Sequence, residues 1–273
     1  AMWMPEEVER RTAWAAEGLA AARADGDAAA EAVLLVSAAV DAIELARREE
    51  FEALAAEGER IARRERLPYV LLTLLWLKMS LATVRSDEEQ ALAHLAELGR
   101  TAPLVAVPHQ DLQPAAAYAV SALWSPERLR PLIEPLRAAQ AEFGDGANLL
   151  HAVVSRVGTR DELVEVLRIP VEHEPVSYWA SVWDWCTEAE AAFLTEDREL
   201  ARRALDVLAP FAGRLTICGA VFTLGPLDGF LALCRATLGE PGVEADVAAA
   251  VELARAWDMP AYVDWLRSLL PGT

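Results

Sequence analysis

The hydrophobic positions of this chain recur at helical spacing from its start to its end. Apolar residues return every three or four positions, and each run stops at a proline, a glycine or an acidic cluster that favours a helix start. Helix and short break alternate in paired units of about 35 to 50 residues, a length typical of helical repeats. The pattern predicts an all-α fold, a right-handed α-solenoid of stacked antiparallel helix pairs of the TPR-like kind, with about 12–13 helices.

The expected boundaries follow from prolines and acidic residues in first helical turns. In the first third we expect helices from Pro5 to about residue 24, and over 27–47, 50–66, 68–84 and 86–99; in the last third, over 175–194, 198–209, 226–239, 243–257 and 260–270. In the middle third we expect helices over 112–124, 126–143 and 148–157 and one that starts at 159. Connectors are expected at 100–114 and 168–175. No linker is rich enough in Gly, Ser or Pro to separate independent domains, so we expect one repeat domain, 1–273, with sub-lobes 1–168 and 175–273.

Charge narrows the classes of partner. The chain carries 25 basic and 43 acidic residues, a net charge of −18, which repels nucleic acid and anionic membrane surfaces. Its single lysine, Lys78, stands in an apolar run without the glycines of a phosphate-binding loop, so nucleotide hydrolysis is not expected. The apolar run 69–84 is shorter than the roughly 20 residues that span a bilayer, so no membrane partner is expected either.

Cysteine and histidine spacing predicts neither a metal site nor a cofactor. The cysteines Cys186, Cys218 and Cys234 form no C-x-x-C pair and resemble core residues of a protein in the reducing cytoplasm. Glu172, His173 and Glu174 are adjacent, but neighbouring residues point in different directions and no second histidine lies at ligand spacing. No signal peptide is visible at the N-terminus, so we expect a cytoplasmic location.

Polar and aromatic residues recur at i, i+3, i+7 on several expected helices. In solenoids the first helices of successive pairs line the concave face, so aligned stripes predict a groove for a ligand or partner. The alternative, that these are ordinary contacts between helices, stays open. The stripes comprise Thr73, Trp76 and Ser80; Ser121 and Trp124; Asn148, His151 and Ser155; and Tyr178, Ser181, Trp185 and Glu188.

The stripes also predict which aromatic residues are exposed. Residues three, four or seven apart share a helix face, whereas Trp183 and Trp185 cannot. We therefore expect Trp179 and Trp183 in the core. The residues expected to be partly exposed on one continuous surface are Trp76, Trp124, His151, Tyr178 and Trp185.

The last third resembles a known family. It contains an L-x-P-[FY]-A-G turn at 208–213, Gly225 and Pro226 before a short apolar helix, Leu238 and Gly239 at its end, and then AAAVELARAWDMPAYV. These features are similar to the C-terminal tetratricopeptide-like region of actinobacterial ATPase-containing transcriptional regulators of the LuxR and SARP types. More loosely, TAWAAEGLAAARADGD at 12–27 resembles the start of that region. The chain departs from the family in lacking a phosphate loop, a cyclase segment and a helix-turn-helix, so the resemblance implies only a sensing and protein-contact role.

Two functions from different classes follow. The first is a non-enzymatic regulatory or sensory module, in signal transduction and transcription regulation, that binds a protein segment or a small-molecule effector without contacting nucleic acid directly; homo-oligomerisation stays open. The alternative is a stand-alone helical protein of specialised metabolism that shapes a small substrate in an aromatic cavity. Nine tryptophans motivate the alternative, but no Ser-His-Asp arrangement or acid-rich metal motif accompanies them.

Overall fold

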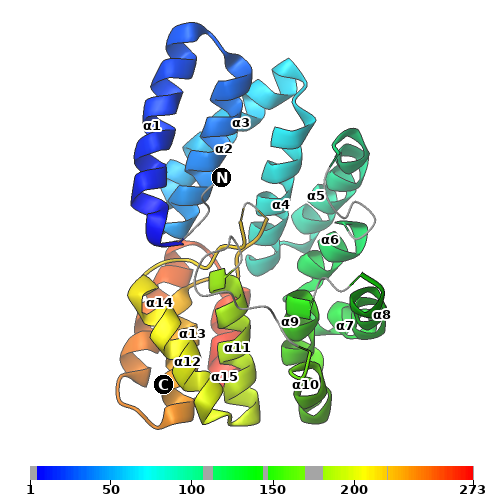
Figure 1. Ribbon diagram of the computed structural model, residues 1–273, viewed down its shortest axis with the longest axis vertical. Helices are drawn as coiled ribbons and strands as arrows, with labels where there is room; N and C mark the ends of the chain where they lie inside the picture. The colour runs from blue at the N-terminus through cyan, green and yellow to red at the C-terminus, as the bar shows by residue number, and fades with distance from the viewer. Residues whose placement is uncertain (1–4, 107–112, 144–146, 170–180, 220, 273) are drawn as a thin grey trace.

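The computed structural model describes residues 5–106, 113–143, 147–169, 181–219 and 221–272, and in these ranges it is all-helical. Consecutive helices of the first third pack side by side and antiparallel (Figure 1). A 3-10 turn, η1 (Pro5–Glu7), precedes them. They are α1 (Val8–Asp25), α2 (Ala28–Glu44), α3 (Arg48–Glu65), α4 (Pro68–Val84) and α5 (Glu88–Thr101), which continues into η2 (Ala102–Leu104).

The middle of the chain consists of shorter helices. Pro131 has no backbone N–H to donate, so the single helix expected over 126–143 is broken into α7 (Pro126–Leu129), η3 (Arg130–Leu132) and α8 (Ile133–Phe143). The chain consequently has more helices than the 12–13 expected. The other helices of this part are α6 (Gln113–Ala122), α9 (Ala147–Val157) and α10 (Arg160–Val166).

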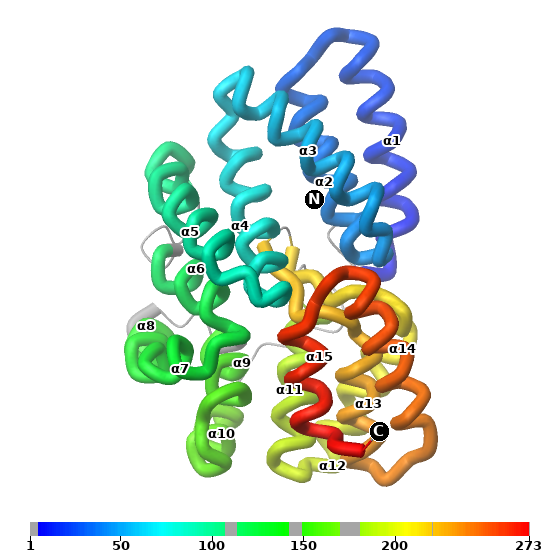
Figure 2. Tube along the Cα trace, turned by 180° about the vertical axis from the view of Figure 1, so that it is seen from behind, coloured from blue at the N-terminus to red at the C-terminus, as the bar shows by residue number. Residues whose placement is uncertain are grey.

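The last third forms a second group of helices beneath the first (Figures 1 and 2). Helices α11, α12 and α13 pack against one another, α14 packs on α13, and α15 reaches α4. The helices are α11 (Ser181–Thr195), α12 (Arg198–Leu208) with η4 (Ala209–Phe211), α13 (Leu227–Leu238), α14 (Val243–Ala256) and α15 (Pro260–Leu269).

One turn geometry joins six pairs of consecutive helices in the described residues. In each of these turns, the residue just before the N-cap of the following helix has a left-handed backbone, with φ between 57° and 70°. The backbone N–H of the N-cap residue then donates to the carbonyl of a buried alanine five positions earlier. A small side chain there leaves room for the following helix to begin close by. These alanines are Ala22, Ala42, Ala62, Ala82, Ala192 and Ala254.

The first four alanines are spaced 20 residues apart, as are the helix caps Asp27, Arg47, Leu67 and Asp87. A helix pair in this region therefore repeats every 40 residues. That is longer than the 34 residues of a tetratricopeptide repeat. The first third is thus regular in sequence and structure, with a repeat length that differs from that of a tetratricopeptide repeat.

The irregular segment 212–226 lies between the two groups of helices (Figure 1). Thr216 and Thr223 are buried there, and their hydroxyls satisfy backbone groups of the segment: the Thr216 hydroxyl accepts from Leu224 N at 2.7 Å, and the Thr223 hydroxyl from Gly225 N at 3.0 Å. One continuous hydrophobic core runs from Leu19 to Leu270 around this segment. Residues 215–219 and 222–226 are buried, so this part of the segment belongs to the interior and is not a surface loop.

Candidate functional site

The expected stripes point into the interior of the molecule. Trp76 is 5% exposed, His151 2% and Trp185 9%, so the expectation that these three lie on an open surface is wrong. Trp183 is 4% exposed, in agreement with the expectation for it. Among the other stripe residues, Thr73 and Trp124 are half-buried and Ser80, Ser121, Ser155, Ser181 and Glu188 are buried. Several of the expected residues lie outside the described part of the chain: Tyr178, Trp179, Glu172, His173, Glu174 and the side chain of Asn148.

The last third of the chain covers two of the stripe residues, Ser80 and Trp124. Ser80 on α4 accepts a hydrogen bond from Thr223 N at 3.0 Å and donates to Thr223 O at 3.3 Å. Trp124 packs edge-on against Tyr262 and Trp265 of α15, with ring centroids 6.1 and 6.0 Å apart. At Ser80 and Trp124, the face that the repeat pattern marks for a ligand is thus occupied by Thr223 and α15 of the same chain.

An aromatic cage encloses Arg156 at this junction. The guanidinium carbon lies 4.3 Å from the ring centroid of Trp124 and 4.2 Å from that of Trp265, so it makes a cation–π contact with each of two rings that meet edge to face. The Arg156 Nε also lies 2.8 Å from Glu190 Oε1, which accepts from Trp265 Nε1 at 3.0 Å. Burial raises the pKa of Glu190, while Arg156 and the bond from Trp265 oppose the increase. The aromatic residues here enclose a cation of the chain itself.

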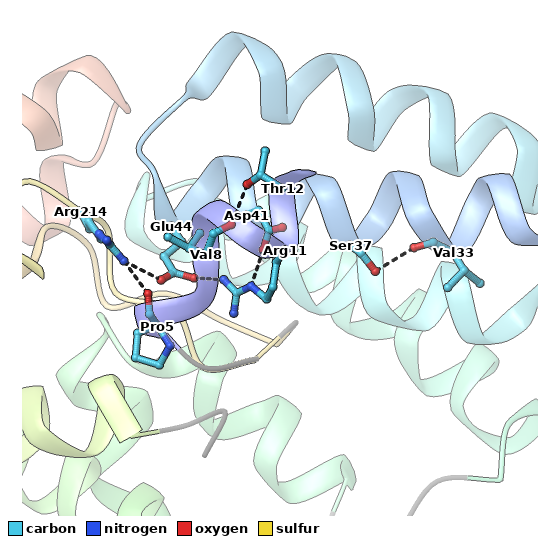
Figure 3. Close-up of polar contacts among 9 residues, drawn as sticks. All are labelled: Pro5, Val8, Arg11, Thr12, Val33, Ser37, Asp41, Glu44 and Arg214. Atoms are coloured by element: carbon cyan, nitrogen blue, oxygen red, sulfur yellow. Dashed lines mark hydrogen bonds and ion pairs between the residues drawn. The ribbon is translucent and has the colours of Figure 1, made fainter. Parts of the chain in front are cut away.

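A second buried ion cluster joins the start of the chain to segment 212–226 (Figure 3). Asp41 and Glu44 of α2 share Arg11 of α1, whose Nε lies 3.0 Å from Asp41 Oδ1. Arg214 donates to Glu44 Oε1 at 3.2 Å and to Pro5 O at 2.8 Å. Burial raises the pKa of Asp41 to about 7, with Arg11 lowering it and Glu44 raising it further. Two carboxylates and two guanidiniums thus connect the two helix groups.

We expect Asp41→Asn to flatten the pH dependence of stability. The folded pKa of about 7 is above the unfolded value of 3.8, so folding retains a proton between these pH values and stability falls as pH rises through 7. From pH 5 to pH 8 the free energy of unfolding of the natural protein should fall by about 2 to 3 kcal/mol more than that of the variant. Urea titrations across this range measure the difference; parallel curves for the two proteins would contradict the assignment.

An open groove of about 520 Å³ is formed by α3, α4 and α5. Helix α4 is its floor, with α3 and α5 as the walls. Its apolar lining includes Ala55, Ala56, Leu81 and Ala82. Its polar lining is Glu52, Glu59, Arg60 and Arg63 of α3, Lys78 and Arg85 at the α4 face, and Asp87, Gln90 and His94 toward α5.

Cations outnumber carboxylates in this groove, four to three, against the acidic charge of the chain. Burial would raise the pKa of Glu59, but hydrogen bonds from Lys78 and Arg63 outweigh it and hold the pKa below its usual value. Asp87 caps α5 by accepting from Gln90 N at 3.0 Å. Glu52 also accepts from Arg48 at 2.9 Å, so all three carboxylates are engaged, and Glu59 in turn neutralises part of the charge of Lys78 and Arg63.

Arg85 is the least satisfied cation of the groove. Its Nε donates to Trp257 O at 3.3 Å, whereas its buried Nη2 has no hydrogen-bond partner among the described residues and lies 3.7 Å from Glu52 Oε1. Burial lowers the pKa of Arg85, and the charge of Arg48 lowers it further. An added negative charge at this end would stabilise the guanidinium.

The sequence analysis missed this groove. Its signals were the single lysine within an apolar run and Arg85 seven residues later on the same helical face. Neither residue matches a motif of known chemistry. Lys78 and Arg85 line a site only because α3 and α5 leave a hollow between them, and the local sequence pattern does not predict that hollow.

The three cysteines show no sign of reactivity. Cys186, Cys218 and Cys234 are buried and free, and burial raises the pKa of each thiol, so the nucleophilic thiolate is disfavoured. In the described part of the chain no three His, Cys, Asp or Glu side chains gather as metal ligands. Within the same ranges, no helix has the length and apolar character needed to cross a membrane.

Comparison with known proteins does not identify the chain. No protein-family model, no curated protein and no solved structure matches it.

Proposed function

We propose that this chain is a non-enzymatic helical-repeat binding module that takes an anionic ligand in the α3–α4–α5 groove. The observation that carries the proposal is the groove itself: about 520 Å³, within the range of small-molecule sites, and lined with an excess of cations on an acidic protein. The regular 40-residue helix pairs support a repeat architecture. The resemblance of the last third to regulator repeat regions supports a sensory role within a bacterial transcriptional regulator.

Contacts at one end of the groove connect it to the last third of the chain. Arg85 donates to Trp257 O, and Arg48 donates to Ala256 O at 2.9 Å, so two cations beside the groove hold the turn between α14 and α15. Phe51, which lines the groove, packs on Trp257 with ring centroids 5.9 Å apart. A ligand that draws Arg85 toward itself changes the support of this turn, and a module that senses a ligand needs such a connection.

We expect Ala56→Trp to abolish binding of an anionic apolar dye, anilinonaphthalene sulfonate. Ala56 is exposed and lines the groove, so an indole fills the hollow without disturbing the core. Dye fluorescence should rise with the natural protein and stay at the buffer level with the variant.

The matched control is Ala53→Trp. Ala53 is also exposed on α3 but does not line the groove, so this variant should bind the dye like the natural protein. Circular dichroism verifies that both variants are folded. Equal dye binding by Ala56→Trp and Ala53→Trp would place the dye elsewhere and count against the groove.

A further inference from the structure

We infer that a second hollow, between α9, α10, α11 and α15, binds a small apolar molecule that carries one carboxylate. This hollow, the Arg160 hollow, has a volume of about 300 Å³, at the lower end of the range of small-molecule sites. It shares no lining residue with the α3–α4–α5 groove, so the inference does not depend on the proposed function. It follows from the apolar walls of the hollow, from an excess of hydrogen-bond donors and from one unbalanced positive charge.

Apolar side chains from all four helices line the Arg160 hollow. They are Val154 of α9, Leu163 of α10, Leu194 of α11, and Trp265 and Leu269 of α15. Burial of hydrocarbon surface against such side chains removes it from water, which is the main favourable contribution to binding in small hollows. The walls therefore favour an occupant with an apolar body.

The buried polar lining is the ion pair of Arg156 and Glu190, whose side chains are 6% and 3% exposed. Glu190 Oε2 accepts from Arg156 Nε at 2.9 Å, and Glu190 Oε1 accepts from Trp265 Nε1 at 3.0 Å. Glu190 is the only carboxylate among the described lining residues, and both of its oxygens are engaged within the chain. This carboxylate is therefore not available to the other donors of the hollow.

Two lining residues carry buried polar atoms without partners. Nη2 of Arg156 and the hydroxyl of Ser155 have no hydrogen-bond partner among the described residues, and both residues line the hollow. A buried donor without an acceptor lowers stability, so the hollow favours an occupant that brings acceptors over one that brings donors.

Arg160 gives the hollow a positive charge that Glu190 does not balance. Its Nη2 donates to the backbone carbonyl of Thr195 at 2.8 Å, and it forms no ion pair with a carboxylate of the described residues. Because Arg156 and Arg160 face a single carboxylate in this lining, one positive charge remains, on a chain whose net charge is −18. Arg160 is exposed, so a carboxylate that enters the hollow can reach its guanidinium and form a charge-assisted hydrogen bond.

Calorimetric titration of the full chain with four small molecules tests the class of ligand. Hexanoate should bind most tightly. Hexanamide keeps the apolar tail and an acceptor but lacks the charge, so it should bind about fivefold more weakly or worse. Acetate lacks the tail and should bind more weakly than hexanoate, and hexylammonium, which brings donors and a positive charge, should not bind. Hexanamide binding as tight as that of hexanoate would overturn the carboxylate, and no binding by any of the four would overturn the site.

Arg160→Gln tests the cation. It should weaken hexanoate binding by about fivefold or more and leave hexanamide binding nearly unchanged, because only the carboxylate uses the charge. Arg267→Gln is the matched control: Arg267 is exposed on α15 and does not line the hollow, so this variant should bind hexanoate like the natural protein. Equal hexanoate affinity in Arg160→Gln and Arg267→Gln would overturn the role of Arg160.

Two tryptophan variants distinguish the Arg160 hollow from the α3–α4–α5 groove. Ser268 is exposed and lines the Arg160 hollow, so Ser268→Trp should fill it and abolish hexanoate binding, while circular dichroism verifies the fold. Ala56→Trp fills the groove instead and should leave hexanoate binding unchanged. If Ala56→Trp abolishes hexanoate binding and Ser268→Trp does not, the carboxylate binds in the groove, and this inference is overturned while the proposed function stands.

Discussion

Replacing Arg156 by Ala should lower the free energy of unfolding by about 3 to 5 kcal/mol, the typical loss when one member of a buried ion pair is removed. The side chain of Arg156 is 6% exposed and that of Glu190 3%, so the variant leaves a carboxylate buried without its counter-ion. It also removes the cation between Trp124 and Trp265. Urea denaturation at neutral pH measures the change.

A double variant separates the net contribution of the ion pair to stability from the cost of leaving one buried charge alone. Arg156→Met with Glu190→Leu removes both charges and keeps apolar volume between the rings, so it should recover most of the stability that Arg156→Ala loses. Because burial raises the pKa of Glu190, the single variant should also gain stability as pH falls, since protonation then removes the uncompensated charge. A loss below about 1 kcal/mol in Arg156→Ala would show that water reaches the site freely.

Replacing Gly229 by Ala should lower the free energy of unfolding by about 3 kcal/mol or more, through overpacking and the disturbance of a buried hydrogen bond. A Cβ at this position would stand 1.9 Å from Tyr262 Oη and 3.0 Å from its Cζ. Tyr262 is fully buried, and its hydroxyl donates to Pro226 O at 2.7 Å, so the ring has nowhere to move without losing that bond. Thermal and urea denaturation measure the effect.

Tyr262→Phe in the Gly229→Ala background removes the atom that clashes. The double variant should therefore be more stable than Gly229→Ala alone, although Tyr262→Phe by itself costs about 1 kcal/mol for the lost hydrogen bond. Gly99→Ala is the matched control, because a Cβ there meets nothing within 4 Å and alanine favours a helix by about 0.5 to 1 kcal/mol over glycine. A double variant less stable than the single would show that the strain lies elsewhere.

Much of the fold follows from local pattern. The breaks at Asp27, Arg47, Leu67 and Asp87 are visible as polar residues, or as the residue before a proline, between apolar runs. The helices that follow these breaks start within two residues of the expected positions. The sequence also carries the repeat length, in alanines at 22, 42, 62 and 82. Helical spacing and turn chemistry are local properties, so helix boundaries can be predicted from them without knowledge of the tertiary contacts.

The candidate site depends on packing between distant segments. Periodicity shows that Trp76 and Trp185 stand on definite faces of their helices, but it does not say whether solvent, a ligand or another helix covers those faces. Here α15 covers Trp124, and Thr223 covers Ser80, to which it is hydrogen-bonded although the two residues are 143 positions apart. The groove beside Lys78 became visible only once α3 and α5 were placed on either side of α4.

The contacts that join the two ends of the chain affect how quickly it folds. Each helix pair of the first third closes over short distances and can form within microseconds to milliseconds. The contacts from Arg214 to Pro5, from Arg48 to Ala256 and from Trp257 to Ala46 instead join residues 209, 208 and 211 positions apart. Loops of that length close slowly, so helix pairs should appear early in a refolding experiment, and the burial of Trp257 should mark a later, rate-limiting step.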